Sequence, residues 1–393
     1  MRKLEKKLVS FNEIDPGGFY MKRLSILFIT VVILVCAVNT SFADEATMSE
    51  EPVIETYRAK VLKIESIKEE YPEANITLIK QKVDARILNG GLKGEIVEAE
   101  NNMSGNPAYD IELKEGDIIS LGMEQGENGE RLFHVKGYER TRYVYQLIGI
   151  FLVLLVIAGG WKGLKSIVSL GVTIGLVFYV MIPLLLKGIS PIFISIGVCA
   201  AATIITMIVI TGWNKKSLAA IIGTIGGITA GGGIAYLYGL LAQLTGLSEV
   251  EAQMLLDIPQ QVKFDFRGLL FAGILIGALG AAMDVSVSIA SALTELIQKD
   301  RNLTFRQILK HGMNIGKDIM GTMSNTLILA YTGGALSMIL LFVVYPRPVN
   351  VIINFDFVAT EIIRSIAGSI GLIFAIPITA ISFGLMHKKN ESR

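Results

Sequence analysis

The sequence predicts an α-helical polytopic membrane protein with a small β-rich domain, an OB-like barrel or a sandwich, on its extracytoplasmic side. Of the 393 residues, 52% are hydrophobic and 18% are charged, which is too apolar for an ordinary soluble protein and too charged for one that lies wholly within a membrane. The charges are concentrated in residues 44–143, whereas residues 144–393 form long apolar runs separated by short charged loops. We therefore expect a β-rich domain at 44–143 and a membrane domain at 144–393.

The N-terminus has the pattern of a secretory signal. Lys22 and Arg23 precede an apolar stretch, and a small-x-small sequence ends at Ala43. This pattern predicts a signal peptide or an uncleaved signal anchor at residues 21–43, with residues 1–20 as a cytoplasmic lead or a mis-assigned start. In either case we expect the chain that follows to emerge on the outer side of the membrane.

Five short segments of the β-rich domain alternate apolar and polar residues and are rich in β-branched side chains. They are YRAKVLKIES, NITLIKQKVDARILNG, LKGEIVEAEN, DIELKEGDIISLGME and RLFHVKGYER. Turn sequences such as NGG and EGD separate them, so we expect five strands. Five strands in about 100 residues fit a small barrel or a compact sandwich.

Seven apolar segments follow, each close to the roughly 20 residues that a bilayer requires. They are approximately residues 144–160, 165–186, 190–211, 217–244, 268–293, 320–345 and 361–386. With the β-rich domain outside, the loops expected on the inner side and the C-terminal tail hold most of the basic residues. This positive-inside bias predicts a cytoplasmic C-terminus.

Asp284 lies well inside the fifth of these spans. A charged side chain at the centre of a membrane helix costs roughly 2.5–3.5 kcal/mol on insertion scales, so such residues face polar partners or water. Ser288, Ser291 and Glu295 follow at helical offsets, which gives this span one polar face.

The next span begins with polar residues along one side, and both spans meet the same inner loop. Because a helix rises about 1.5 Å per residue, Asp284 and Asn325 fall at comparable depth, and we expect a polar nest between the two helices. The candidate proton- or ion-coupling residues are Asp284, Ser288, Ser291, Thr322, Asn325 and Thr326, with Glu295 and Asp318 as secondary candidates. The alternative is a structural hydrogen bond that only fixes the helix packing.

Glu361 and Arg364, at the start of the last span, are further secondary candidates. Their spacing allows an ion pair across one helical turn, and the alternative is that they anchor the helix at the membrane interface. The 40 glycines of the chain place small residues about one turn apart, which permits close helix packing, a gliding interface or self-association.

Several functional classes are excluded by composition and spacing. A net charge of +1 gives no basis for a nucleic-acid partner. Cys36 and Cys199 lie in apolar segments and the three histidines are scattered, so we expect no metal site, no cofactor and no enzymatic activity. The chain also has no phosphate-binding loop of the Gly-x-x-x-x-Gly-Lys-Ser/Thr type, which argues against an ATP-driven pump.

Four stretches resemble the YibE/F-like family of bacterial integral membrane proteins. They are FLVLLVIAGGWKGLKSIVSL, GALGAAMDVSVSIASALTE, GKDIMGTMSNTLILAYTGGAL and GSIGLIFAIPITA. The resemblance extends over nearly the whole chain from about residue 50 and is most specific between residues 277 and 334. It implies a multi-spanning protein of the bacterial cell membrane and little about its chemistry.

A more distant resemblance is to SecD/SecF and the resistance–nodulation–division permeases. It concerns a small-residue helix with an aspartate, the basic loop KDRNLTFRQILKHG and a helix start rich in Thr, Ser and Asn. Asp284 corresponds to the aspartate of that pattern, and Thr322 and Thr326 correspond to its threonine pair. In that superfamily, intramembrane carboxylates couple proton movement to the work of an outer domain, which the resemblance implies for Asp284. The chain departs from that pattern in its eight hydrophobic segments, where those proteins have six spans per outer domain.

Two functions follow from these patterns. The first is an ion- or proton-coupled transporter or an export accessory, with Asp284 as the coupling carboxylate. The alternative is a non-transporting structural or regulatory component whose outer domain binds a partner in the membrane or outside it. Proton flux that depends on Asp284 distinguishes the two.

Overall fold

The computed structural model describes residues 55–71, 76–106, 108, 110–126, 129–256 and 264–391. The predicted signal segment at residues 21–43 lies outside these residues. The described chain divides at about residue 155 into two compact units, a β-rich unit and a helical unit.

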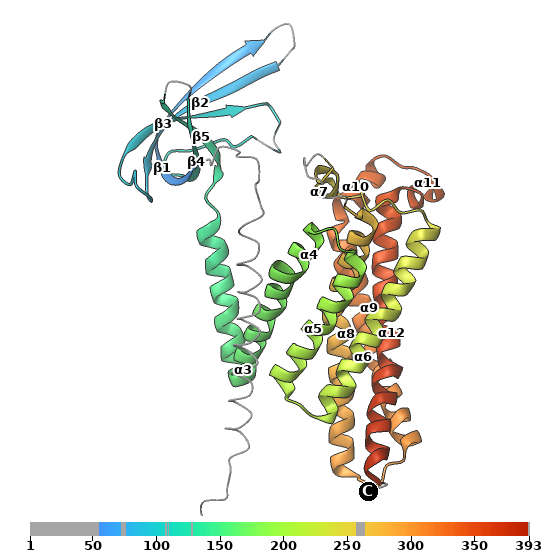
Figure 1. The fold of residues 1–393 in the computed structure, drawn as a ribbon. Coiled ribbons are helices and arrows are strands. Elements are labelled where there is room, and N and C mark those ends of the chain that lie inside the picture. Colours follow the sequence, from blue (N-terminus) through green and yellow to red (C-terminus); the bar gives the residue numbers. More distant parts are fainter. Residues whose placement is uncertain are drawn as a thin grey trace, which may run out of the picture. The chain divides into compact units, whose positions relative to one another are not determined.

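The β-rich unit contains a closed five-stranded barrel, which confirms the β-rich domain that the sequence predicts (Figure 1). Its strands are β1 (Glu55–Tyr71), β2 (Ile76–Ile87), β3 (Ile96–Met103), β4 (Ile118–Gln125) and β5 (Arg131–Tyr138). The order around the barrel is β1-β2-β3-β5-β4, and β4 pairs again with β1. Only β3 and β5 pair in parallel. A register shift between Val61 and Lys63 marks a bulge in β1, and such bulges bend a strand enough to close a sheet.

Alternating residues of the strands fill the barrel interior, as the period of two requires. The buried apolar residues are Tyr57, Ala59, Val61, Val83, Ala85, Ile87, Ala99, Leu113, Ile119, Leu121 and Phe133. Two polar residues, Gln81 and Asn101, are also buried, and the Asn101 amide donates to the Gln81 side-chain oxygen at 2.9 Å. The same Gln81 oxygen accepts from the Leu113 backbone N–H at 3.2 Å, so the interior pair is satisfied.

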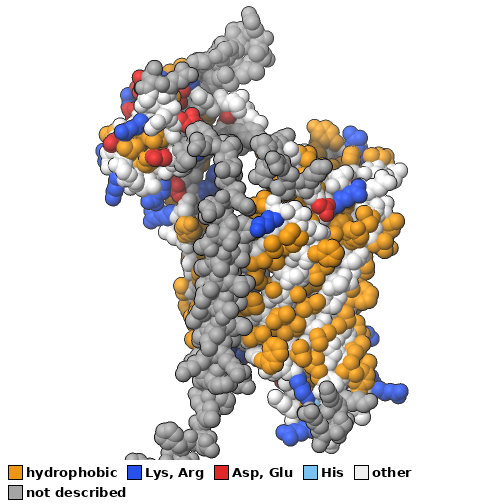
Figure 2. Space-filling view, viewed as in Figure 1, with side chains coloured by type: hydrophobic (Ala, Val, Ile, Leu, Met, Phe, Trp, Pro, Cys, Tyr) orange, Lys and Arg blue, Asp and Glu red, His pale blue; other side chains and the backbone are white. Residues whose placement is uncertain are grey.

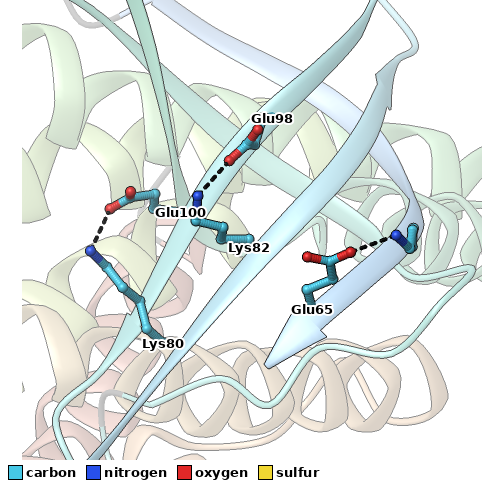
Figure 3. Close-up of polar contacts among 6 residues, drawn as sticks. Glu65, Lys80, Lys82, Glu98 and Glu100 are labelled. Atoms are coloured by element: carbon cyan, nitrogen blue, oxygen red, sulfur yellow. Dashed lines mark hydrogen bonds and ion pairs between the residues drawn. The ribbon is translucent and has the colours of Figure 1, made fainter. Parts of the chain in front are cut away.

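Ion pairs lie on the outer side of the barrel (Figure 3). Lys80 pairs with Glu100 and Lys82 with Glu98, both at 3.2 Å across β2 and β3. The hydrogen bond that the exposed Lys82 ammonium donates to the Glu98 carboxylate raises the pKa of Lys82. Such exposed pairs stabilise a fold little, and they mark this surface as one that faces water.

A long apolar segment joins α3 (Thr141–Leu176), the π-helical turn η2 (Val177–Met181) and α4 (Ile182–Leu186), and the division between the two units falls within α3. As one straight helix, its 46 residues would measure about 69 Å, roughly twice the hydrocarbon thickness of a bilayer. Gly160 has φ 52° and ψ −130°, outside the helical region, and interrupts α3. The break falls between the first two spans that the sequence predicts.

The remaining helices are α5 (Pro191–Thr211), α6 (Lys215–Leu241), α7 (Val250–Met254), α8 (Phe266–Lys299), α9 (Phe305–Gly334), α10 (Leu336–Val344), α11 (Val349–Ile353) and α12 (Asp356–Glu391). Within the described residues, five helical segments are long and apolar enough to cross a membrane, and the bent pair α9–α10 gives a sixth. Figure 2 shows charged side chains gathered at the two ends of the helical unit, with a mostly hydrophobic surface between them. The protein is therefore a multi-pass membrane protein.

Glycines bring α6 and α12 into backbone contact. A Cβ atom placed on Gly227 lies 2.7 Å from the carbonyl oxygen of Gly371, and one on Gly231 lies 2.8 Å from that of Ala367. No larger residue fits at either position without moving the backbone. The glycine spacing therefore produces tight helix packing at this seam.

α12 is the central helix of the unit and packs against α6, α8 and α9 (Figure 1). Gly312 and Gly316 of α9 lie against Ala380 and Ile376 of α12. One face of α9 is thereby fixed on α12, which leaves its opposite face exposed.

The sixth predicted span differs from the observed helix. The sequence places it at residues 320–345, but α9 starts at Phe305, where Thr304 and Gln307 form a capping box. After Gly334 the chain bends by 62° into α10. The basic loop and the span thus share one continuous helix, and the span is broken near its far end.

Candidate functional site

Asp284 lies near the middle of α8, about 27 Å along the helix from Phe266 and about 22 Å from Lys299. Its side chain is on the exposed face of the helix, and it forms no hydrogen bond or ion pair with any described residue. A Cβ atom placed on Gly273 or Gly280, on the same face, would have no neighbour within 4 Å. The predicted site residues that share this exposure are Ser288 and Glu295 of α8, and Asp318, Thr322, Asn325 and Thr326 of α9.

α9 runs antiparallel to α8 along this face, because only a short loop joins them. A Cβ atom placed on Gly277 of α8 would meet the Tyr331 hydroxyl, so these two residues are level with each other. Two helical turns from this contact, in the same direction along both helices, lie Asp284 of α8 and Ser324 of α9. The structure therefore brings Asp284 to the level of Ser324 and Asn325, the depth that the sequence predicts for Asn325.

The hydroxyls of the predicted nest bond to their own helices. The Ser291 hydroxyl donates to the Val287 carbonyl at 2.6 Å, Thr322 donates to Ile319 at 2.9 Å, and the Thr326 hydroxyl donates to the Thr322 carbonyl at 2.9 Å. Backbone carbonyls one turn earlier are the usual acceptors for Ser and Thr within a helix. Within the described chain no hydrogen bond of these hydroxyls joins the two helices, and Thr322 and Thr326 lie exposed on the side of α9 away from Tyr331.

Ser324 is a residue that sequence reasoning missed. Its Oγ is buried and has no hydrogen-bond partner among the described residues. Unpartnered buried polar atoms are rare, and each one requires an explanation. Ser324 lies at the level of Asp284, so its Oγ is a second oxygen that could bind a proton, an ion or water at this level.

A charged cluster lies at the α7 end of the bundle. Arg364 of α12 pairs with Glu249 at 2.9 Å and with Glu361 at 2.8 Å, and its guanidinium lies 6.0 Å from the centre of the Tyr331 ring. The Arg364 Nε is buried and has no partner among the described residues. Glu361 and Arg364 thus form the pair that their spacing allows, with a second carboxylate that comes from a distant loop.

This cluster borders a cavity of about 490 Å³ at the bend between α9 and α10. The lining residues are Ser248, Glu249, Ala330, Tyr331, Gly334, Ala335, Met338, Leu341, Phe357, Glu361 and Arg364. Tyr331 is common to the cavity and to the contact with Gly277, so it connects this end of the bundle with the face that carries Asp284. The volume is in the range of small-molecule pockets.

Metal ligation has little support in the described chain, where no group of three or more His, Cys, Asp or Glu side chains could hold a metal ion. The family comparisons fit the two units. A family model described as YibE/F-like protein matches residues 147–389, and one described as the YibE/F family N-terminal domain matches residues 50–138. No curated protein and no solved structure matches the chain. The first of these models alone covers more than half of the chain, which therefore belongs to the YibE/F-like family.

Proposed function

We propose that this multi-pass membrane protein is an ion- or proton-coupled transporter or export accessory in which Asp284 is the coupling carboxylate. The observation behind the proposal is the position of Asp284, at mid-helix on a face of α8 that α9 borders and without a partner in the described chain. A carboxylate at such depth requires a proton, an ion, water or a polar partner. The distant resemblance to proton-coupled permeases points in the same direction.

The residues on either side of Asp284 suggest a route along the seam. Toward the α7 end, Gly280 and Gly277 lie on α8 between Asp284 and the level of Tyr331, which lines the cavity. Toward the other end, Ser288 and Glu295 follow on the exposed face of α8. Small and polar residues along one helix face leave room for water or ions beside the carboxylate.

The proposal includes an orientation in the bacterial cell membrane, with the barrel outside and the C-terminus in the cytoplasm. Lys215, at the start of α6, donates to the Met386 carbonyl near the end of α12 at 2.9 Å, so both belong to one end of the bundle. The α8–α9 loop, with Arg301, lies at that end as well, because α8 runs antiparallel to α6. The basic residues of these loops favour the cytoplasmic side.

Proton flux into liposomes tests the coupling role. The purified full-length chain is reconstituted, a potassium diffusion potential is applied, and internal pH is followed with a trapped dye. We expect flux in the wild type, its loss in Asp284→Asn and its partial recovery in Asp284→Glu, because only the carboxyl variants exchange a proton. Glu251→Gln, a neutralised carboxylate on the exposed helix α7, is the matched control and should keep wild-type flux. Equal flux in wild type and Asp284→Asn would contradict the proposal.

One observation favours the alternative of a partner-binding, non-transporting component. The β-rich unit has a cavity of about 640 Å³ that includes Arg58, Asn89, Arg142 and Tyr145 in its lining. Arginine and aromatic side chains are enriched at protein–protein interfaces, which favours a partner protein at this site. Photo-cross-linking from position 145 in native membranes tests this function. A single specific adduct that Arg142→Glu abolishes, in a protein without proton flux, would favour the alternative.

A further inference from the structure

We propose that the cavity at the α9–α10 bend binds a small organic cation, with Glu361 and Glu249 as its counter-charges and the ring of Tyr331 beside it. The inference deepens the proposed function, because it names a substrate class for the transporter. Binding itself requires only this cavity and does not require proton exchange at Asp284.

The charge of the lining favours a cation. Glu249 and Glu361 provide two carboxylates against the single guanidinium of Arg364, so the described lining has one negative charge in excess. The side chain of Glu249 is 56% exposed, whereas that of Arg364 is only 19% exposed. The Glu249 carboxylate is therefore more accessible than the guanidinium, which favours a cation over an anion.

The remaining lining favours an organic ligand over a bare metal ion. Met338 and Leu341 of α10 and Phe357 of α12 provide apolar surface, and Tyr331 provides an aromatic face. A divalent ion would need several oxygen ligands that converge on one point, and no such group of carboxylates occurs among the described residues. An ammonium group with an apolar substituent fits both halves of the lining, since aromatic faces attract such cations.

The cavity exists because the bend of the chain is held in place. After Gly333 and Gly334 the helix turns by 62°, so α10 leaves the line of α9 and space remains beneath it. Phe342 of α10 stacks on Phe355 and Phe357 at ring-centroid distances of 5.6 and 6.1 Å, which ties α10 to the start of α12. The site is therefore built from α9, α10, α12 and the residues just before α7.

Arg364 then has a positioning role. It holds the two carboxylates on one side of the cavity and lies over the ring of Tyr331, whose hydroxyl touches the Asp284 face at Gly277. A cation that pairs with Glu361 competes with Arg364 for that carboxylate. Tyr331 therefore belongs both to the cavity and to the contact between α9 and the Asp284 face of α8.

Isothermal titration of the purified full-length chain in detergent tests the inference. Three probes share one ring and differ in charge: 2-phenylethylammonium, 2-phenylethanol and 3-phenylpropionate. We expect the cation to bind at least about 10-fold more tightly than the alcohol, which corresponds to about 1.4 kcal/mol, and we expect no binding of the anion. Equal affinity for all three probes, or tighter binding of the anion, would overturn the proposal.

Variants locate the site and separate this inference from the proposed function. Glu361→Gln should weaken binding of the cation at least about 10-fold. Glu249→Gln, at the exposed rim where folding is not at risk, should weaken it several-fold. Glu251→Gln should bind as the wild type does, and unchanged affinity in Glu361→Gln and Glu249→Gln would place the ligand elsewhere. Proton flux that depends on Asp284 in a chain that binds no cation would refute this inference and leave the proposed function standing.

Discussion

Two glycine-lined faces of the helical unit have opposite surroundings. At the seam between α6 and α12, Gly227 and Gly231 lie against backbone atoms of the facing helix at 2.7–2.8 Å, measured from a Cβ placed on each. On the face of α8 that carries Asp284, Gly273 and Gly280 have no neighbour within 4 Å. The same residue type therefore closes one seam and leaves the other open.

The difference shows what glycine does in each place. At the closed seam its lack of a side chain lets two helices touch, which stabilises the bundle through packing. On the open face the missing side chains leave space beside a carboxylate. The proposed function uses that space for the ions or water beside Asp284. The following predictions test this comparison, from the largest expected effect to the smallest.

A side chain at the closed seam should break the fold. Gly231→Val places atoms 2.8 Å from the Ala367 carbonyl oxygen and 2.9 Å from the Gly371 Cα, and backbone cannot move away cheaply. We expect a loss of about 3 kcal/mol in the free energy of unfolding, measured by denaturation in detergent. Gly233→Val, in the same helix with no neighbour within 4 Å, is the control and should change stability little. Equal losses in the two variants would mean that the seam is not closed.

A side chain on the open face should impair transport and leave the fold intact. Gly280→Leu fills the space one turn from Asp284, where a placed Cβ meets nothing within 4 Å. We expect an unchanged melting temperature and a proton flux that falls about 10-fold. Gly273→Leu lies on the same face about three helical turns from Asp284 and should keep its flux. A loss of stability in Gly280→Leu would indicate that another surface already covers this face.

Removal of an unpartnered hydroxyl should stabilise the closed bundle slightly. Thr224 of α6 is fully buried, and its Oγ1 has no hydrogen-bond partner among the described residues. Thr224→Val keeps the shape and removes the desolvation cost, so we expect a gain of about 1 kcal/mol in the free energy of unfolding. Thr379→Val is the comparison, because its hydroxyl donates to the Ala375 carbonyl at 2.7 Å and its loss should bring no gain. Destabilisation by Thr224→Val would show that the hydroxyl has a bound partner.

The sequence is sufficient for the barrel because strand periodicity is local. Residues such as Val61 and Val83 alternate with charged neighbours, so five strands follow from a period of two. The closed order of the strands depends on long-range pairing, which alternation does not encode. The bulge beside Lys63 is likewise a product of that pairing.

The site is less accessible to sequence reasoning. The depth of Asp284 follows from counting residues, but the side of α9 that faces it depends on how Gly312 and Gly316 pack on α12, so Ser324 was missed. The charged part of the cavity lining contains the pair between Glu249 and Arg364, which are 115 residues apart in the chain. No local pattern predicts such a contact.

The central claim is that the carboxyl group of Asp284 takes up and releases a proton midway along α8. Infrared difference spectroscopy of the protein in liposomes measures this directly, because protonated carboxyl groups have a carbonyl stretching band of their own. We predict a band that appears and disappears reversibly with pH in the wild type, shifts in Asp284→Glu and is absent in Asp284→Asn. Identical spectra of the wild type and Asp284→Asn across the whole pH range would contradict the account.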